Sequence, residues 1–377
     1  MDLDLSDDQA ELQQSVRAVL ERECPISFVR AVVEQDAQTE DLWATMVSLD
    51  WPALAVDPAD GGLGMGTVEL VVTAEELGRA VAPTPLLATA AQFVPALRLA
   101  GDEAQRRRFL GAVAADGLAG SLAVAEGAGP VDATAVATTA TPDGDGYVLR
   151  GRKDNVFDAG RADEVVVAAR LPGTRGEAGI GLFVVPRSAT RTERLVALDA
   201  SRRLGAVILD DVRVDHSRVL GDPTTSGPGT ALTSILQVAT TALAAEIVGT
   251  CQAIFDIVHA YVNAREQFGV KIGSFQAIKH KLADMYVALE SARTTTWFAA
   301  AAIDEDDERA PLAVAMAKAS AGDCQRLLTK EGIQTLGGIG FTWEHDMHLY
   351  VKRAKTAAAL FGTAAEHRAR VATGIGL

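Results

Sequence analysis

The chain has 377 residues, 48% of them hydrophobic, and a formal net charge of -15. This length and apolar content predict a folded protein of two or three domains with a sizeable core. The acidic excess is spread along the chain, apart from one cluster at Asp304–Glu308, and it argues against nucleic acid as a partner.

The cysteines and the N-terminus both indicate in which cellular compartment the protein is found. Cys24, Cys251 and Cys324 are widely spaced, with no C-x-x-C motif and no nearby histidine pair, so we expect reduced, mostly buried thiols and no metal site. Met1–Asp4 is acidic and is not a basic region followed by an apolar run, and no uninterrupted apolar stretch approaches bilayer length. These features predict a cytoplasmic protein without membrane insertion.

Residues 1–118 carry helical signals. Ser6 followed by Gln9 forms a capping box, and apolar residues recur behind it at helical spacing. The run Asp57–Gly64 reads as a plain glycine-rich connector between helices. We expect an all-α domain here.

Residues 119–224 change to short β-rich runs divided by turns. The expected strands are Tyr147–Leu149, Glu164–Ala169, Ile180–Val185 and Val207–Val214. They predict a small β-barrel or sandwich.

Residues 225–377 begin within a Gly/Pro/Thr linker at Thr224–Gly229. After this linker the chain is helical almost to its end. Ile278, Leu282, Met285 and Leu289 form the stripe of a helix packed in a bundle. The fold class is therefore α+β, with domains at 1–118, 119–224 and 225–377.

Three runs in the last domain carry the most specific signal. They are R-E-Q-F-G at Arg265–Gly269, I-G-S-F-Q-A-I at Ile272–Ile278 and Q-T-L-G-G-I-G-F at Gln334–Phe341. Taken singly, each has a structural explanation, such as a helix that ends near Gln267, a solvated arginine or an amide that caps a helix. Together they resemble the acyl-CoA dehydrogenase family, and the resemblance covers essentially the whole chain.

The resemblance implies a fold and a cofactor. The fold has an N-terminal all-α domain, a middle β-barrel or sandwich, and a C-terminal four-helix bundle. In the family, the arginine of R-x-Q-F-G and the glutamine of Q-x-x-G-G reach across a dimer interface to the pyrophosphate and adenosine of FAD. A guanidinium suits a pyrophosphate, and glycines allow close backbone approach. The implied FAD contacts are Arg265, Phe268, Gln276, Gln334, Gly337 and Gly338.

The catalytic base of the family has no counterpart here. That base is a carboxylate, usually in a Y-E-G-T run, which takes a proton from Cα while a hydride from Cβ passes to the flavin. The matching run is L-F-G-T, in which Phe361 cannot accept a proton. Some members carry the carboxylate 26 residues before the arginine of R-x-Q-F-G, and that position is Ala239, followed by Thr240.

Two flavin-facing segments also depart from the family pattern. Its T-E-P-G-A-G-S-D run is A-E-G-A-G-P-V-D at Ala125–Asp132, and its W-I-T-N run is N-V-F-D at Asn155–Asp158. Loss of general-base catalysis alone costs about 10²- to 10⁴-fold in rate. We therefore assign no catalytic residue to this chain.

Two nearby acidic groups offer replacements, and we interpret both as structural. Glu246 shares the helix face of Ala239 but lies two turns away, about 10 Å along the axis, so we expect it to be paired within the bundle. The W-E-H-D run at Trp343–Asp346 predicts a helix start with acidic caps, without metal geometry.

The retained residues are those that reach a neighbour's FAD, whereas the lost ones complete the chain's own site. The chain thus resembles the non-catalytic-type subunit of actinobacterial heteromeric acyl-CoA dehydrogenases, some of which act on CoA thioesters of steroid side chains. This predicts FAD-dependent α,β-dehydrogenation of an acyl-CoA in a heterotetramer, or a homo-oligomer, with a related subunit that supplies the glutamate. An electron-transferring flavoprotein is the acceptor expected by resemblance.

Three alternatives stay open. The first is an autonomous homo-oligomeric acyl-CoA dehydrogenase whose base comes from another position. The second is a flavin monooxygenase on the same fold, for which a buried base is dispensable. The third is a structural pseudoenzyme that stabilises a partner without touching the cofactor.

Overall fold

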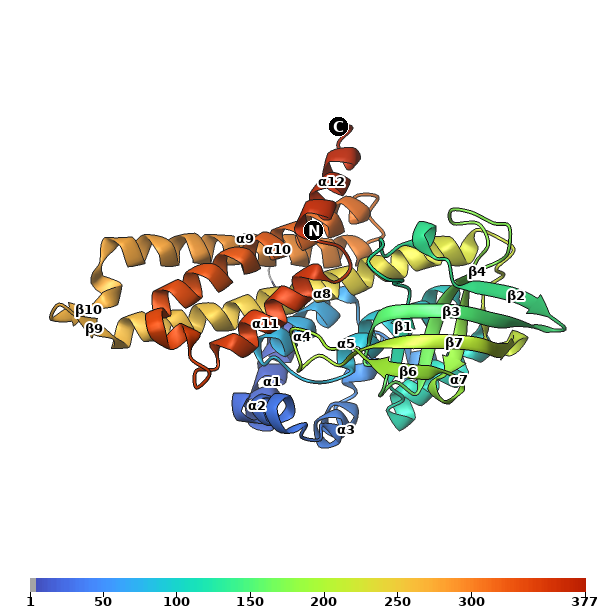
Figure 1. Ribbon diagram of the computed structural model, residues 1–377, viewed down its shortest axis with the longest axis horizontal. Coiled ribbons are helices and arrows are strands. Elements are labelled where there is room, and N and C mark those ends of the chain that lie inside the picture. The colour runs from blue at the N-terminus through green and yellow to red at the C-terminus, as the bar shows by residue number, and fades with distance from the viewer. Residues whose placement is uncertain (1–4) are drawn as a thin grey trace. The chain divides into compact units, whose positions relative to one another are not determined.

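The computed structural model describes residues 5–377 (Figure 1). Met1–Asp4, on which the N-terminal prediction rests, lie outside the described residues. The chain forms two compact units: unit 1 takes the described part of Met1–Gln38 with Thr67–Ala82 and Thr240–Leu377, and unit 2 takes Thr39–Gly66 with Pro83–Ala239. Helix α8, Gly227–Ala264, contributes residues to both.

Unit 1 is helical. Its other helices are α1 (Asp7–Glu23), α2 (Ile26–Gln35), α4 (Thr67–Arg79), α9 (Gln276–Asp304), α10 (Ala310–Leu336), α11 (Met347–Ala359) and α12 (Ala364–Gly374). The capping box of Ser6 and Gln9 is present at the start of α1. Asp304, at the end of α9, accepts hydrogen bonds from the backbone N–H groups of Thr67 and Val68 and so caps the start of α4.

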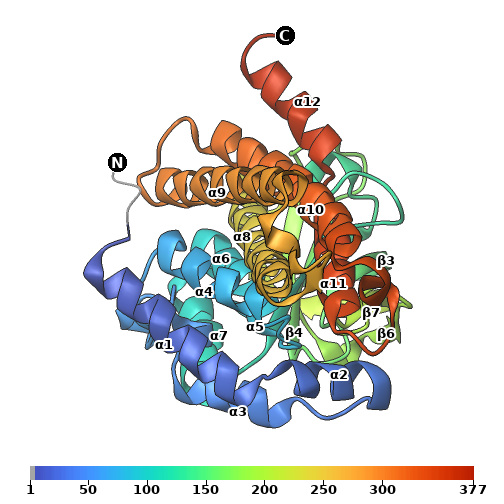
Figure 2. The ribbon, with the colours of Figure 1, turned by 90° about the vertical axis from the view of Figure 1, so that its left-hand side faces the viewer.

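The long helices of unit 1 pack side by side as a bundle (Figure 2). Met285 and Leu289 of the predicted α9 stripe are fully buried, while Ile278 and Leu282 are half-buried. Antiparallel α9 and α10 are tied by an ion pair between Lys281 and Glu331, with 2.7 Å between the charged atoms. The beginning of α9 and the end of α10 therefore lie at the same end of the bundle.

Unit 2 joins helices to a sheet. Its helical segments are α3 (Glu40–Ser48), α5 (Leu86–Ala88), the π-helical turn η3 (Thr89–Phe93), α6 (Val94–Ala100) and α7 (Glu103–Asp116). The strands are β1 (Gly120–Ala123), β2 (Thr139–Asp143), β3 (Gly146–Phe157), β4 (Glu164–Arg170), β5 (Ile180–Pro186), β6 (Arg191–Arg194), β7 (Leu204–Asp215) and β8 (Val219–Leu220). The sheet order is β6-β7-β3-β2-β4-β5-β8, with β1 parallel to β4.

The central strand β4 is buried on both faces of the sheet. Val166 and Ala168 face a core shared with helices, while Val165 and Val167 face a second core formed with β3, β5 and β7. Neighbouring residues of a strand point to opposite faces, so burial on both sides requires a continuous apolar run. Helical segments, a mixed sheet and a helical bundle confirm the predicted α+β fold class.

Helix α8 corrects the expectation that no stretch approaches bilayer length. By length and composition it passes the test for a membrane-spanning helix, with a mean hydropathy of 1.5. However, 72% of that window is buried inside the protein, as in a core helix.

The linker prediction was also three residues too long, because Gly227–Gly229 already forms the first turn of α8.

Candidate functional site

The R-E-Q-F-G run forms a hairpin rather than the end of a helix. Helix α8 ends at Ala264, and β9 (Glu266–Gln267) pairs with β10 (Val270–Lys271). Phe268 and Gly269 connect them with φ angles of 53° and 78°. Two left-handed residues match a two-residue hairpin turn, but an aromatic residue in that conformation costs about 1–2 kcal/mol. Such strain points to a functional demand on Phe268.

The structure gathers all six predicted cofactor residues at one end of the bundle. The hairpin leads directly into α9, and the antiparallel pairing brings the end of α10 beside it. The side chains of Arg265, Gln276 and Gln334 are exposed and form no hydrogen bond or ion pair within residues 5–377. Gly337 and Gly338, which follow α10, have open space where a side chain would begin. This end offers free polar groups to something outside the chain.

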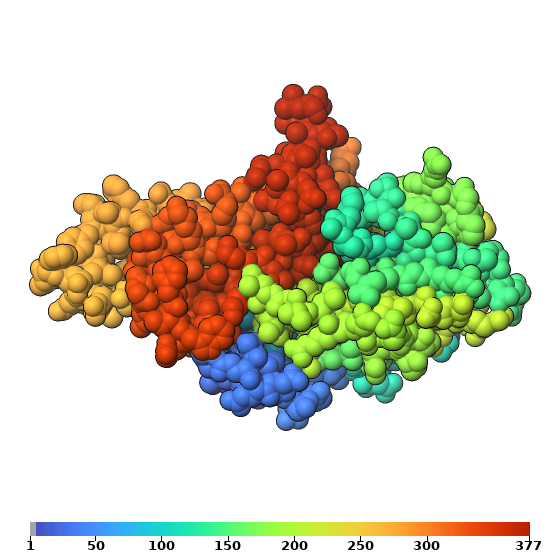
Figure 3. Space-filling view, viewed as in Figure 1, coloured from blue at the N-terminus to red at the C-terminus, as the bar shows by residue number. Residues whose placement is uncertain are grey.

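Apolar side chains accompany these polar groups. Phe268 is 93% exposed and Phe341, in the turn η8 (Gly337–Phe341), is 79% exposed. Phe268 packs edge-on against Phe275, with 6.3 Å between ring centres. Exposed apolar groups that cluster in this way mark an interaction surface. Figure 3 shows the open orange surface formed by the hairpin and the start of α9. Phe275 and Phe341 were not predicted as site residues.

The turn at Phe361 is held by two buried side chains, His367 and Lys318, which donate hydrogen bonds to its backbone carbonyls. Phe361 and Gly362 have φ angles of 55° and 94°. The Nε2 atom of His367 donates to the Phe361 carbonyl over 2.9 Å, and the Lys318 Nζ donates to the Gly362 carbonyl over 2.7 Å. Burial lowers the pKa of Lys318 to about 7 and that of His367 to about 4. Sequence reasoning missed both residues, because neither forms part of a local motif.

Glu246, the carboxylate considered as a replacement base, already forms an ion pair. Ala239 and Thr240 are buried, and two turns further along α8 the Glu246 carboxylate pairs with Arg353 of α11 over 2.9 Å. Both charged side chains are buried. The prediction that Glu246 is paired within the bundle is confirmed.

The W-E-H-D run begins a helix, as predicted, but not with an acidic cap. Asp346 precedes α11, yet its carboxylate binds Arg30 over 2.7 Å. The backbone N–H of Met347 instead donates to Nδ1 of His345. Residues 5–377 contain no group of three or more His, Cys, Asp or Glu side chains that could hold a metal.

The diverged segments of unit 2 also have internal partners. Glu126 accepts hydrogen bonds from Lys153, over 2.6 Å, and from the backbone N–H groups of Ala137 and Thr138. Burial lowers the pKa of Lys153 to about 8. Burial also acts to raise the pKa of Glu126, but Lys153 and these hydrogen bonds lower it overall. Glu126 thus organises its own segment.

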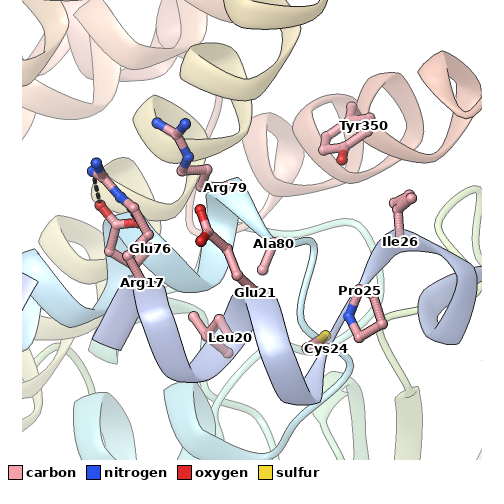
Figure 4. A pocket seen from close by; sticks show the side chains of 10 residues that line it. All are labelled: Arg17, Leu20, Glu21, Cys24, Pro25, Ile26, Glu76, Arg79, Ala80 and Tyr350. Carbon is pink, nitrogen blue, oxygen red and sulfur yellow. Dashed lines mark hydrogen bonds and ion pairs between the residues drawn. The ribbon is translucent and has the colours of Figure 1, made fainter. Parts of the chain in front are cut away.

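A cavity of about 250 Å³ lies among α1, α2, α4 and α11 of unit 1 (Figure 4). Three of its charged lining residues are already paired, since Arg17 binds Glu76 and Arg79 binds Asp256. Burial raises the pKa of the Cys24 thiol to about 12, so it is no nucleophile at neutral pH. Cys24, Cys251 and Cys324 are free and buried, as predicted.

Helices, sheet and bundle in this order are the architecture of the acyl-CoA dehydrogenases as a class. Family models of their N-terminal, middle and C-terminal domains match residues 6–116, 121–212 and 226–376 in turn. The chain belongs to the acyl-CoA dehydrogenase family, whose members are oxidoreductases, and family membership implies FAD as the cofactor.

Three similar proteins illustrate this relationship. The probable acyl-CoA dehydrogenase FadE25 of Mycobacterium tuberculosis is 29% identical over 95% of this chain and 93% of its own length. Acyl-CoA dehydrogenase IpdE2 of the same organism is 30% identical over 93% and 91%. The solved structure of the Tcur3481-Tcur3483 steroid ACAD is 31% identical and covers 98% of both chains, with a TM-score of 0.86.

Proposed function

We propose that this chain is a subunit of a heteromeric acyl-CoA dehydrogenase and completes the FAD site of a catalytic partner. One observation carries the proposal: Phe361 occupies the position of the family's base, while Glu246, the carboxylate considered as a replacement, is paired with Arg353. A phenyl ring accepts no proton, and the Glu246 carboxylate is already engaged by the Arg353 guanidinium. The partner therefore supplies the base.

The exposed end of the bundle suits the pyrophosphate and adenosine of FAD. The Arg265 guanidinium can form charge-assisted hydrogen bonds to a pyrophosphate, and the amides of Gln276 and Gln334 can bind adenosine. The open backbone at Gly337 and Gly338 admits close approach. Phe268 presents a ring for stacking. Bound there, the flavin would accept the hydride from the substrate Cβ.

The remaining residues of this chain act by positioning and exclusion. Lys318 and His367 hold the Phe361 turn, so that an apolar ring stands where the family has an acid. This half-buried ring exchanges no protons. The aromatic patch around Phe268 and Phe341 would be covered by the partner.

The substrate and partners follow from the same reasoning. The substrate is an acyl-CoA thioester, dehydrogenated between Cα and Cβ, and the partner is a related acyl-CoA dehydrogenase subunit in a heterotetramer. The two-component steroid ACAD that this chain resembles supports such an assembly. An electron-transferring flavoprotein is the proposed electron acceptor. We also propose a cytoplasmic location and retain the domains 1–118, 119–224 and 225–377.

The flavin-to-polypeptide ratio, measured by visible absorption, tests this proposal. We expect a ratio near zero for the folded chain purified alone and a clear flavin spectrum for the complex isolated through a tag on this chain. Arg265→Ala should lower the flavin content of the complex, whereas Arg22→Ala, at an exposed arginine on α1, should not.

Each rival makes a different prediction. A ratio near one for the isolated chain would favour the autonomous dehydrogenase or the monooxygenase. Unchanged flavin content in the Arg265→Ala complex would favour the structural pseudoenzyme.

A further inference from the structure

The cavity among α1, α2, α4 and α11 lies within unit 1 and is lined by both apolar and polar side chains. Its volume is about 250 Å³. Pockets for drug-sized ligands measure about 300–1,000 Å³, so this one suits a smaller molecule. Leu20, Ile26 and Ala80 form much of its apolar wall. A ligand that fills the cavity therefore needs a short apolar body.

Two arginines line the cavity, and both are already bound to carboxylates of unit 1. Arg17 donates two hydrogen bonds to Glu76, of 3.0 and 2.7 Å. The Arg79 guanidinium lies 2.9 Å from a carboxylate oxygen of Asp256. Because opposite charges at this distance offset each other, these arginines leave no net positive charge at the cavity for an anion.

Glu21 is the charged lining residue that has no such partner. It lies on α1, is exposed, and forms no hydrogen bond or ion pair within residues 5–377. It attracts the Arg17 guanidinium through space without an ion pair. In Figure 4 its carboxylate points from α1 toward the end of α4. The net charge of -15 on the whole chain adds a longer-range attraction for cations.

The hydroxyl of Tyr350 is the second polar group without a partner. Tyr350 lies on α11 and is half-buried, and its hydroxyl forms no hydrogen bond within residues 5–377. In Figure 4 this hydroxyl points from α11 toward α1 and α2. Burial raises the pKa of Tyr350 to about 12, so the phenol is neutral at neutral pH. Its oxygen can accept a hydrogen bond, and its ring attracts a cation.

We propose that this cavity binds a small organic cation, a primary ammonium group on a short apolar chain. The ammonium group donates hydrogen bonds to the Glu21 carboxylate and the Tyr350 hydroxyl, while the apolar chain packs against Leu20, Ile26 and Ala80. Hydrogen bonds between an ammonium and a carboxylate are roughly twice as strong as those between neutral groups. None of the six residues proposed to contact FAD lines this cavity, so the inference does not depend on the proposed function.

Isothermal titration calorimetry of the full chain with three ligands of equal chain length tests the charge of the ligand. Hexylamine is an ammonium ion at neutral pH, as the lysine side chain is. We expect it to bind at least about tenfold more tightly than 1-hexanol, and hexanoate not to bind. Equal binding of the amine and the alcohol, preferential binding of hexanoate, or no binding of hexylamine would overturn the proposal.

Substitutions at the two polar groups test which atoms hold the cation. Glu21→Gln should weaken hexylamine binding about tenfold and leave hexanol binding unchanged, and Tyr350→Phe should have a smaller effect in the same direction. Glu11→Gln is the matched control, because Glu11 is an exposed carboxylate on the same helix that does not line the cavity. Equal losses in Glu21→Gln and Glu11→Gln would mean general attraction to an acidic surface and would overturn the proposal.

Filling the cavity tests where the ligand lies. Ala80 is half-buried just beyond the end of α4, and Ala80→Leu should abolish binding of both hexylamine and hexanol without a change in circular dichroism. Retained affinity in this variant would place the ligand elsewhere and overturn the proposal. Glu21 is exposed, and exposed substitutions of this kind change stability little, so Glu21→Gln decides the question even if Ala80→Leu does not fold.

Discussion

The guanidinium of Arg353 lies 2.9 Å from the carboxylate of Glu246, and both side chains are buried in unit 1. Arg353 also donates to the backbone carbonyls of Val81 and Ala82 just beyond the end of α4. One side chain of α11 therefore ties α8 to the segment that follows α4. The arrangement leaves Glu246 with a structural task rather than a catalytic one.

Glu246→Gln should destabilise the chain by roughly 3 kcal/mol, because it leaves the Arg353 charge buried without its counterion. Denaturant unfolding followed by circular dichroism measures this loss, with Glu11→Gln on the exposed side of α1 as the control. Turnover of the complex should be unchanged once both proteins are folded. Loss of turnover with unchanged stability would contradict the structural role.

Lys318 should make the stability depend on pH in alkaline solution. Its pKa is about 7 in the folded chain, below the ordinary value of 10.5, so the unfolded state binds more protons between these values. The free energy of unfolding should therefore rise with pH across this window, by at most about 1.4 kcal/mol per pH unit. Lys318→Met should flatten the rise, whereas Lys355→Met, at an exposed lysine, should leave it intact. The measurement is denaturant unfolding at a series of pH values from 7 to 10.5.

Gly337 and Gly338 should respond differently to alanine. Gly337 has φ 65° and ψ -139°, a conformation nearly restricted to glycine, so Gly337→Ala should cost about 1–3 kcal/mol. Gly338 has open space around it and no positive φ, so Gly338→Ala should leave the isolated chain as stable as the wild type. In the complex, the added methyl group at 338 should still lower flavin content by obstructing the cofactor. Normal flavin content there would remove Gly338 from the proposed site.

Phe361→Glu restores a carboxylate at the position of the family's base. In the isolated chain we expect no gain of acyl-CoA oxidation, because a base contributes only where flavin and substrate are both bound. Anaerobic mixing with a panel of acyl-CoA thioesters, followed at the flavin absorption band, provides the assay, with Phe361→Gln as the non-basic control. A gain of about 10²-fold or more over that control would show that the chain builds a complete site by itself.

Local features of the chain were readable without the structure. The capping box at Ser6 depends on residues three apart, and the strand at Ile180 depends on a continuous apolar run, so neighbours in sequence contain the whole signal. The same is true of the motif runs, whose spacing identified the family. The hairpin at Phe268 was missed because Gly269 also reads as a helix stop, and only the pairing of Glu266 with Lys271 distinguishes the two.

The sequence by itself determined the fold class, the family and the absence of a carboxylate at position 361. Only the tertiary structure decided which distant residues form the buried ion pair and the buried hydrogen bonds to backbone carbonyls. Glu246 and Arg353 are 107 residues apart, and Lys318 reaches a carbonyl 44 residues away. Such partners are chosen by helix packing, which brings distant residues into hydrogen-bond range and buries them together, and no local pattern encodes that distance.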